Sequence, residues 1–241
     1  MRVFQDGART ASGKNKGRAL FNCLLVILLL FQMTRQFLPG MVHEAVGITF
    51  VVLVMVHNAS KRRWYAGLAR GRWNLRRIML TVIGFVLVAV FVGIAACGLG
   101  MSGIAVSLGV AGHTMQLRSA HIALTHLGFL LVGLHVGMHA QPALSRAGRA
   151  LSGRIGMAAA RVAGLALGVF ALVYGAIAFV KLDFTGYISM QTRFAFIDPN
   201  QSVALFVLDH LAVLVLFALA GLALAALATR RTSRITKGLS S

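Results

Sequence analysis

The chain contains few acidic residues and few cysteines. Of its 241 residues, five are Asp or Glu and two are Cys, against 24 Lys and Arg. Two cysteines cannot build a disulfide scaffold, and we expect Cys23 and Cys97 to be buried, inert thiols. The five acids are scattered along the sequence, and no Ser, His and Asp set is recognisable. The sequence therefore shows no group of residues suited to acid–base catalysis of hydrolysis.

Charged residues as a whole are also scarce. Only 12% of residues are charged, whereas 58% are hydrophobic and the mean hydropathy is +0.82. Soluble domains are typically about 45–50% apolar and about 25% charged, so the composition predicts an integral membrane protein in a lipid bilayer. The net charge of +19 does not indicate nucleic-acid binding, because the basic residues cluster between apolar runs, where the positive-inside rule places them.

Six apolar runs come near the roughly 20 residues that a helix needs to cross a bilayer. They are predicted over residues 19–38, 41–57, 78–97, 119–139, 162–180 and 202–228. The predicted fold class is all-α, a polytopic membrane bundle of six transmembrane helices. One membrane domain, residues 19–228, then lies between basic tails at residues 1–18 and 229–241. The first run is followed by Pro39-Gly40 rather than a small-residue cleavage site, so we expect an uncleaved helix.

The distribution of basic residues predicts the orientation. Six spans put both termini on one side, and 20 of the 24 Lys and Arg fall on that side. The other side keeps Arg35, Arg118, Lys181 and Arg193. The positive-inside rule then predicts a protein of the cell inner (cytoplasmic) membrane with both termini in the cytoplasm.

Two pairs of histidines share one spacing. His43 and His57 bracket the second run and are fourteen residues apart, and His121 and His135 repeat this spacing in the fourth run. Fourteen residues of helix return to within about 40° of the same face and rise about 21 Å. Each helix therefore presents two imidazoles on one side, near opposite edges of the membrane. Polar side chains at such depth are rare and usually functional.

The matched spacing predicts two stacked metal centres. The second and fourth spans run parallel, so His43 meets His121 at the outer level and His57 meets His135 at the inner level. Haem iron takes axial imidazoles above and below the macrocycle. Zinc would need about four ligands, and no Cys, Asp or Glu set is nearby. We therefore expect a haem-binding four-helix core with two b-type haems, held non-covalently because Cys-x-x-Cys-His is absent.

The surplus histidines leave the inner ligand open. His139 lies one turn beyond His135 on nearly the same side and is the alternative inner ligand, or a contact to a propionate or proton. His126 points away from His121, which favours a structural role. His113 and His210 are isolated, and for such residues a hydrogen bond or solvation is the simpler explanation.

Small and basic residues beside the ligands are the other candidate contacts. Gly47 and Gly128 would give a flat macrocycle clearance, although small residues also pack membrane helices. Arg118, three residues before His121, is a candidate contact for the outer haem. Arg62 is a candidate partner of the inner propionates, because arginine suits bidentate carboxylate contacts; positive-inside charge is the simpler explanation.

The sequence contains two glycine motifs of different kinds. Gly133-x-x-x-Gly137 indicates either a helix-packing face or a backbone that the haem approaches. Gly98-x-Gly100-x-x-Gly103 matches a dinucleotide fingerprint in letters only, because it follows a membrane helix and not a strand.

Several motifs together resemble a known family. His43-Glu-x-x-Gly47, followed by His57-Asn58 and Trp64, resembles the opening of the flavinylation-associated cytochromes. The stretch from His121 to His139 is similar to that family's second histidine helix. The later motifs that resemble its C-terminal half are Tyr187-Ile-Ser-Met-x-x-Arg-Phe194, Phe196-Ile-Asp198 and Leu208-Asp209-His210. The resemblance covers about residues 15–228 and implies a membrane electron carrier that serves extracytoplasmic flavoproteins with covalently attached flavin.

The predicted function is transmembrane electron transfer by one-electron hops between the two haems. The expected partners are an extracytoplasmic flavoprotein or another redox protein on one side, and a cytoplasmic-side or quinol donor on the other. The chain would be an electron carrier or the membrane subunit of an oxidoreductase, such as a haem-bearing anchor, rather than an enzyme alone. The alternative is a haem-free transporter or proton-relay protein that uses its intramembrane histidines.

Overall fold

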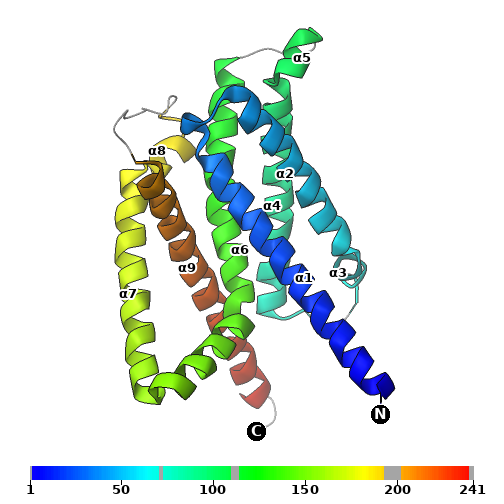
Figure 1. Cartoon of the computed structure of the whole chain (residues 1–241), viewed down its shortest axis with the longest axis vertical. Coiled ribbons are helices and arrows are strands. Elements are labelled where there is room, and N and C mark those ends of the chain that lie inside the picture. The colour runs from blue at the N-terminus through cyan, green and yellow to red at the C-terminus, as the bar shows by residue number, and fades with distance from the viewer. Residues whose placement is uncertain (1, 71–72, 110–113, 193–201, 239–241) are drawn as a thin grey trace. The chain divides into compact units, whose positions relative to one another are not determined.

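The structure, a computed structural model, describes residues 2–70, 73–109, 114–192 and 202–238 (Figure 1). Every regular element in these ranges is helical, and they contain no strand. The helices divide into two compact units, Met1–Leu68 and Ala69–Ser241.

Six helices of the described ranges are long and apolar enough to cross a membrane. Their bounds are Lys16–Met33, Gly40–Ser60, Leu75–Gly100, Met115–Ile155, Met157–Lys181 and Val203–Thr229. This confirms the predicted all-α, polytopic fold. The chain is a multi-pass membrane protein.

The first unit is a pair of long helices followed by a short one. It consists of α1 (Arg2–Met33), a 3-10 turn η1 (Arg35–Phe37), α2 (Gly40–Ser60) and α3 (Arg62–Ala66). The first span was predicted to continue to residue 38, but α1 ends at Met33. The residue before a proline is pushed out of the helical region, and Leu38, before Pro39, is extended at φ −115°, ψ 143°. The predicted basic tail at residues 1–18 is helical from Arg2 onward.

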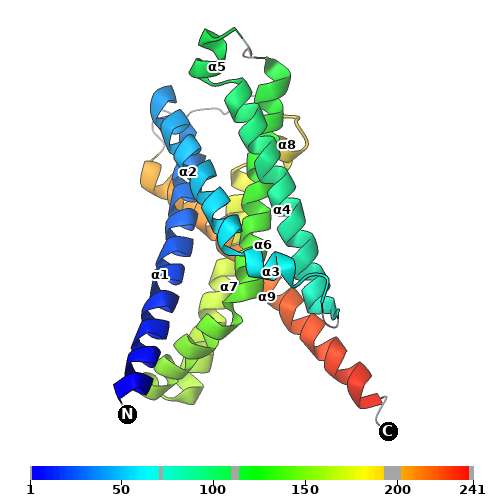
Figure 2. The same ribbon diagram turned by 90° about the vertical axis from the view of Figure 1, so that its right-hand side faces the viewer.

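The second unit is organised around one very long helix. Its elements are α4 (Leu75–Gly100), α5 (Gly103–Ser107), α6 (Met115–Ile155), α7 (Met157–Lys181), α8 (Phe184–Ile188) and α9 (Val203–Gly238). Helix α6 packs against both α4 and α9, α7 packs on α9, and α8 contacts α6 (Figures 1 and 2). Side-chain caps begin α4, α6 and α8. Asn74 accepts from the Arg77 N–H at α4, Thr114 from the Leu117 N–H at α6, and Asp183 from the Gly186 N–H at α8.

Helix α6 extends well beyond its predicted span. A basic connector was expected after residue 139, but α6 continues through Pro142 to Ile155. Proline removes one helical N–H, yet the side chains of Ser145 and Arg146 bond to the Pro142 carbonyl in the next turn. Figure 1 shows that the C-terminal part of α6 turns away from the axis of the rest. The helix ends at Gly156, whose φ of 83° suits glycine.

Three glycines bring α6 and α9 into backbone contact. A Cβ atom built on Gly137 would overlap the carbonyl oxygen of Ala218, and one on Gly221 would overlap that of Leu134. A Cβ on Gly133 would lie 3.0 Å from the carbonyl oxygen of Leu214. The Gly133-x-x-x-Gly137 motif is therefore a helix-packing face, and α9 occupies the space in which a haem was the alternative.

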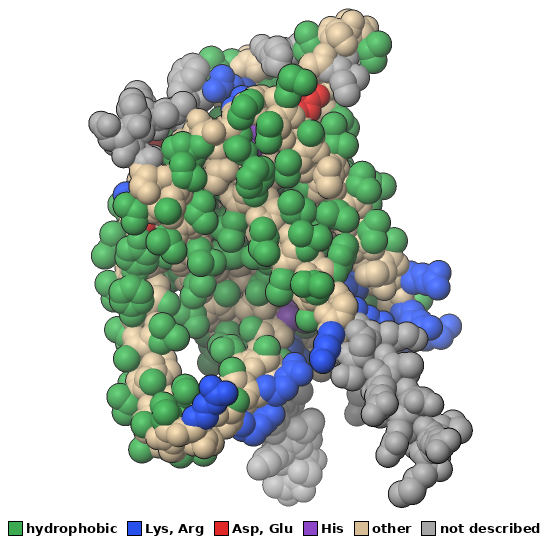
Figure 3. All heavy atoms as spheres, in the orientation of Figure 1, with side chains coloured by type: hydrophobic (Ala, Val, Ile, Leu, Met, Phe, Trp, Pro, Cys, Tyr) green, Lys and Arg blue, Asp and Glu red, His purple; other side chains and the backbone are tan. Residues whose placement is uncertain are grey.

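The outward faces of the helices are apolar. Figure 3 shows hydrophobic side chains along the long faces of the helices, with Lys and Arg gathered near helix ends. Val180 on α7, for example, is 77% exposed, which suits contact with lipid tails. Both cysteines are free, and Cys97 is half-buried. The prediction of a buried thiol is wrong for Cys23, which lies on an exposed face of α1.

The α6–α9 contact predicts a sharp difference between two Gly→Ala variants. Gly137→Ala should lower the free energy of unfolding by about 1–3 kcal/mol, because the added methyl group overpacks a backbone contact. Gly168→Ala in α7 is the matched control, since a Cβ atom added there would meet nothing within 4 Å. Thermal unfolding in detergent measures both. Equal stability of the two variants would contradict this packing.

Candidate functional site

Helix α6 carries two opposed stripes of functional side chains. At about 100° per residue, four positions fall within about 40° of one another and form what we call the histidine stripe. Its members are His121, Gly128, His135 and His139. The packing stripe lies about 120–180° away and contains His126, Gly133 and Gly137. Because α9 covers the packing stripe, the candidate ligands point away from α9.

His121 reaches the backbone of α4. Its Nδ1 atom lies 3.1 Å from the carbonyl oxygen of Ile94. Gly98 makes this approach feasible, since a Cβ atom there would lie 3.2 Å from the His121 Cε1 atom. In the neutral ring that donates from Nδ1, the lone pair is on Nε2. Metal-ligating histidines typically have this arrangement, with the second ring nitrogen donating to a carbonyl.

His135 and His139 lie side by side at the other end of the stripe. Their ring centroids are 4.9 Å apart and their planes make an angle of 59°. The predicted proximity of these two imidazoles is confirmed. Both stay candidates for the second ligand that α6 supplies.

An arginine of α4 contacts α6 between these two histidines. Pro142 has no N–H, so the carbonyl of Met138, four residues earlier, lacks its helical donor. Arg76 supplies one instead, and its Nη2 atom donates to that oxygen at 3.2 Å. The Nε atom of Arg76 is buried and has no hydrogen-bond partner among the described residues. Sequence reasoning missed Arg76 because it counted the residue among the loop charges.

In the first unit, a glutamine of α1 contacts the start of α2 beside His43. Gln32 Nε2 donates to the His43 carbonyl oxygen at 3.4 Å. A Cβ atom on Gly47 would lie 2.8 Å from the same Nε2 atom, so the clearance at Gly47 admits this side chain. Gln32 Oε1 is buried without a hydrogen-bond partner in the described part of the chain. Gln32 was also missed, because a single glutamine in an apolar run has no signature.

His57 lies near the end of α2, where α3 folds back. Its ring stacks on Phe21 of α1, with centroids 6.3 Å apart and an interplanar angle of 15°. The Tyr65 hydroxyl donates to Asn58 Oδ1 at 2.9 Å and ties α3 to α2. Arg62 is the first residue of α3 and is exposed.

The predicted haem contacts of α6 lie where the sequence placed them along the helix. Arg118 is exposed, less than one turn before His121. Gly128 faces α4, and a Cβ atom there would lie 3.2 Å from Val90 Cγ1 and 3.3 Å from Ile94 Cδ1. In this structure the space left by the missing side chain of Gly128 is therefore filled by side chains of α4. Each of the pairs His43 with His121 and His57 with His135 takes one residue from each unit, and both pairs stay predictions.

The residues of the second unit fit a haem in their chemistry. His121 has the tautomer-fixing contact of a ligand, and Arg76 Nε and Thr81 Oγ1 are buried polar atoms of α4 without hydrogen-bond partners in the described residues. No three His, Cys, Asp or Glu side chains come together within the described ranges. This donor set suits an iron porphyrin, which needs two axial imidazoles, better than a bare four-coordinate ion.

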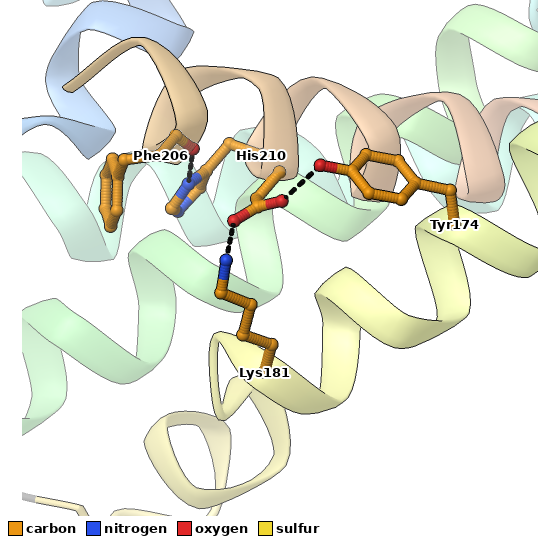
Figure 4. Close-up of polar contacts among 5 residues, drawn as sticks. Tyr174, Lys181, Phe206 and His210 are labelled. Atoms are coloured by element: carbon orange, nitrogen blue, oxygen red, sulfur yellow. Dashed lines mark hydrogen bonds and ion pairs between the residues drawn. The ribbon is translucent and has the colours of Figure 1, made fainter. Parts of the chain in front are cut away.

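A second polar cluster joins α7 and α9 (Figure 4). Asp209 accepts from Lys181 Nζ at 2.7 Å and from the Tyr174 hydroxyl at 2.7 Å. The Asp209 side chain is 3% exposed, whereas that of Lys181 is 54% exposed. The adjacent His210 bonds through Nδ1 to the Phe206 carbonyl oxygen at 2.9 Å. Sequence reasoning noted Asp209 beside His210 but missed the ion pair, because its partner lies 28 residues away.

His126 packs in an aromatic cluster with α8. Its ring stacks on Tyr187 at 4.5 Å between centroids and meets the edge of Phe184 at 5.0 Å. Burial, and then the nearby Asp183, raise the pKa of the Tyr187 phenol, which therefore stays neutral. His126 thus faces α8 while His121 faces α4, which confirms that the two rings point apart. Its contacts are those of a structural residue.

Comparison with known proteins gives no match for this chain. No family model matches it, and neither a curated protein nor a solved structure matches it significantly. The class that the fold defines is an all-α, multi-pass membrane protein. The resemblance to the flavinylation-associated cytochromes stays a proposal. His113, Arg193 and the motif at residues 194–198 lie outside the described residues.

The Asp209–Lys181 pair predicts an asymmetric response to substitution. Lys181→Met should lower the free energy of unfolding by about 1–3 kcal/mol, because it leaves the buried Asp209 carboxylate without its cation; the exposure of Lys181 keeps the loss in this range. Adding Asp209→Leu should recover part of the loss. Thermal unfolding of the two single variants and the double variant measures the coupling. Additive losses would rule out a stabilising pair.

Proposed function

We propose that this protein carries electrons across a membrane through two non-covalent b-type haems. Each haem takes one histidine from α2 and one from α6, His43 with His121 and His57 with His135. His139 is the alternative to His135. The observation that carries the proposal is the recurrence of the fourteen-residue spacing on two membrane-spanning helices. The Nδ1 contact of His121 to the Ile94 carbonyl supports it.

The chain's own residues would bind and orient the two cofactors. Haem supplies a one-electron couple at each level of the membrane. Imidazoles held by backbone carbonyls keep a fixed ring orientation, which His121 has through Ile94. The apolar surroundings of α4 and α6 exclude water and limit the charge reorganisation that accompanies each hop. Arg62 and Arg118 are the proposed contacts around the macrocycles. The space beside Gly47 and Gly128 holds Gln32 and side chains of α4 in this structure, so a haem contact at these two glycines requires those side chains to move.

The orientation and the partners follow from charge and resemblance. The positive-inside rule places both termini in the cytoplasm of a cell whose inner membrane holds the protein. His43 and His121 then lie near the outer surface, and His57 and His135 near the inner surface. The family resemblance favours an extracytoplasmic flavoprotein as the acceptor, with a quinol or a cytoplasmic-side protein as the donor. The chain acts as a carrier or a membrane subunit rather than as an enzyme alone.

One observation favours a second candidate, a haem-free transporter or proton relay. The buried Asp209, with Lys181, Tyr174 and the neighbouring His210, is a set of ionisable groups inside a membrane helix pair. Such groups commonly mark proton or ion pathways. This candidate gives no reason for the matched histidine spacing and predicts a colourless protein.

The proposed ligand pairs predict which variants lose the same haem. His43→Ala and His121→Ala should each lose one haem of two, and the double variant should lose no more than either single one. His57→Ala and His135→Ala should lose the other haem. Reduced-minus-oxidised absorption spectra with a haem count per chain measure this.

His126→Leu is the matched control on α6. It should keep both haems, because His126 packs against α8 and not on the histidine stripe. If the double variant His43→Ala and His121→Ala lost both haems, the pairing would be wrong. If His135→Ala kept both and His139→Ala lost one, His139 would be the ligand. A wild-type protein that stays colourless after expression with ample haem would rule out the proposal.

A further inference from the structure

Arg76 contacts the segment of α6 that carries two candidate ligands, His135 and His139. Its Nη2 atom donates to the Met138 carbonyl oxygen, which Pro142 leaves without a helical donor. Met138 is fully buried and lies three residues after His135 and one before His139. Arg76 therefore bonds to the turn of α6 that carries both imidazoles. The backbone hydrogen bond that Pro142 removes from α6 thus leaves an acceptor that positions the Arg76 guanidinium of α4.

The remaining donors of Arg76 call for an acceptor. Its Nε atom is buried without a hydrogen-bond partner in the described residues. Leaving a buried donor of a charged group unsatisfied is costly. The two acids described in this unit are engaged elsewhere: Asp183 accepts from Gly186 and Thr192, and Asp209 from Lys181 and Tyr174. An anionic group that the described chain does not supply would complete the site.

We propose that Arg76 binds a propionate carboxylate of the haem ligated by His135 or His139, and that it raises the midpoint potential of that haem. This inference rests on the proposed function, because it requires a haem at that end of α6. The planar fork of arginine matches a carboxylate and accepts bidentate contacts. A fixed cation beside the haem favours the reduced state, which carries one more electron. Haem has two propionates, so Arg62 stays a candidate partner of the other.

Arg77 provides a matched control for the charge of Arg76. It is the next residue of α4 and carries the same charge, but its Nη2 donates to the Arg70 carbonyl at 2.8 Å and its guanidinium lies 4.6 Å from the Trp73 ring centre. Arg76→Gln and Arg77→Gln therefore remove equal charge from adjacent positions. If the midpoint potential of one haem falls only in Arg76→Gln, the cause is a specific contact of Arg76. An effect of the positive charge of the whole basic segment would appear in both variants.

The test is a redox titration of each purified holoprotein, followed by haem absorbance. In Arg76→Gln, the ratio of reduced to oxidised haem at a fixed solution potential should fall about tenfold for one haem only, which equals a negative shift of about 59 mV for a one-electron couple. Arg76→Lys should keep most of the wild-type potential. Arg77→Gln should change neither haem by more than about twofold. Resonance Raman spectra of the propionate bending modes should change in Arg76→Gln and not in Arg77→Gln.

The other outcomes separate the role of Arg76 from the proposed function. Unchanged potentials in Arg76→Gln, or equal shifts in both glutamine variants, would overturn the role of Arg76 while two haems in the wild type still supported the proposed function. If Arg76→Gln lost one haem, recovery in Arg76→Lys would support the propionate contact, and no recovery would indicate a packing role and overturn it. A shift seen only in nanodiscs with anionic lipid would assign Arg76 to a lipid headgroup instead. A wild-type protein without haem would overturn both proposals.

Discussion

The backbone contact between α6 and α9 determines which way the side chains of α6 point. Two helices can approach this closely only where glycine removes the Cβ atom, as Gly133, Gly137 and Gly221 do. With one face of α6 covered by α9, the opposite face carries His121 and His135. A shift of α6 by one residue would move each histidine by about 100° and place a side chain in the backbone contact. The contact with α9 therefore fixes the rotation of α6 about its axis, and with it the direction in which the candidate ligands point.

The second constraint is the satisfaction of backbone and side-chain polar groups without water. Hydrogen bonds that cannot be made to solvent must be made within the protein. The Ile94 carbonyl accepts from His121, and the Met138 carbonyl accepts from Arg76 where Pro142 removes the usual donor. Each of these contacts joins α4 to α6 near a candidate ligand. The internal proline of α6 and the histidine–carbonyl contact with α4 thus place polar groups beside the candidate ligands of the histidine stripe.

Features that repeat along a single helix could be predicted from the sequence. The six spans follow from run length, and the separate directions of His121 and His126 follow from the helical period. The extension of α6 beyond residue 139 could not be foreseen, because an internal proline and several arginines indicate a connector as readily as a bent helix. The exposure of Cys23 was predicted wrongly, because in a membrane protein an apolar residue type does not distinguish a buried face from one that meets lipid.

Contacts between distant segments explain the remaining misses. The contacts of Gln32, Arg76 and Asp209 depend on which helices are adjacent in space. A single sequence does not show which helices are adjacent. Gly98 illustrates the same point, since its letters match a dinucleotide motif while its actual contact is the ring of His121. Each of these residues acts through a partner on another helix, so no local pattern in the sequence singles it out.

The most direct test of the central claim is the number and spin state of haems in the purified wild-type protein. Pyridine haemochrome quantification gives the haem count per chain, and low-temperature electron paramagnetic resonance of the oxidised protein reports the axial ligands. Two bis-histidine sites predict about two b-type haems per chain, both low-spin with two imidazole ligands. A protein without haem, or one with a single high-spin haem, would contradict this claim.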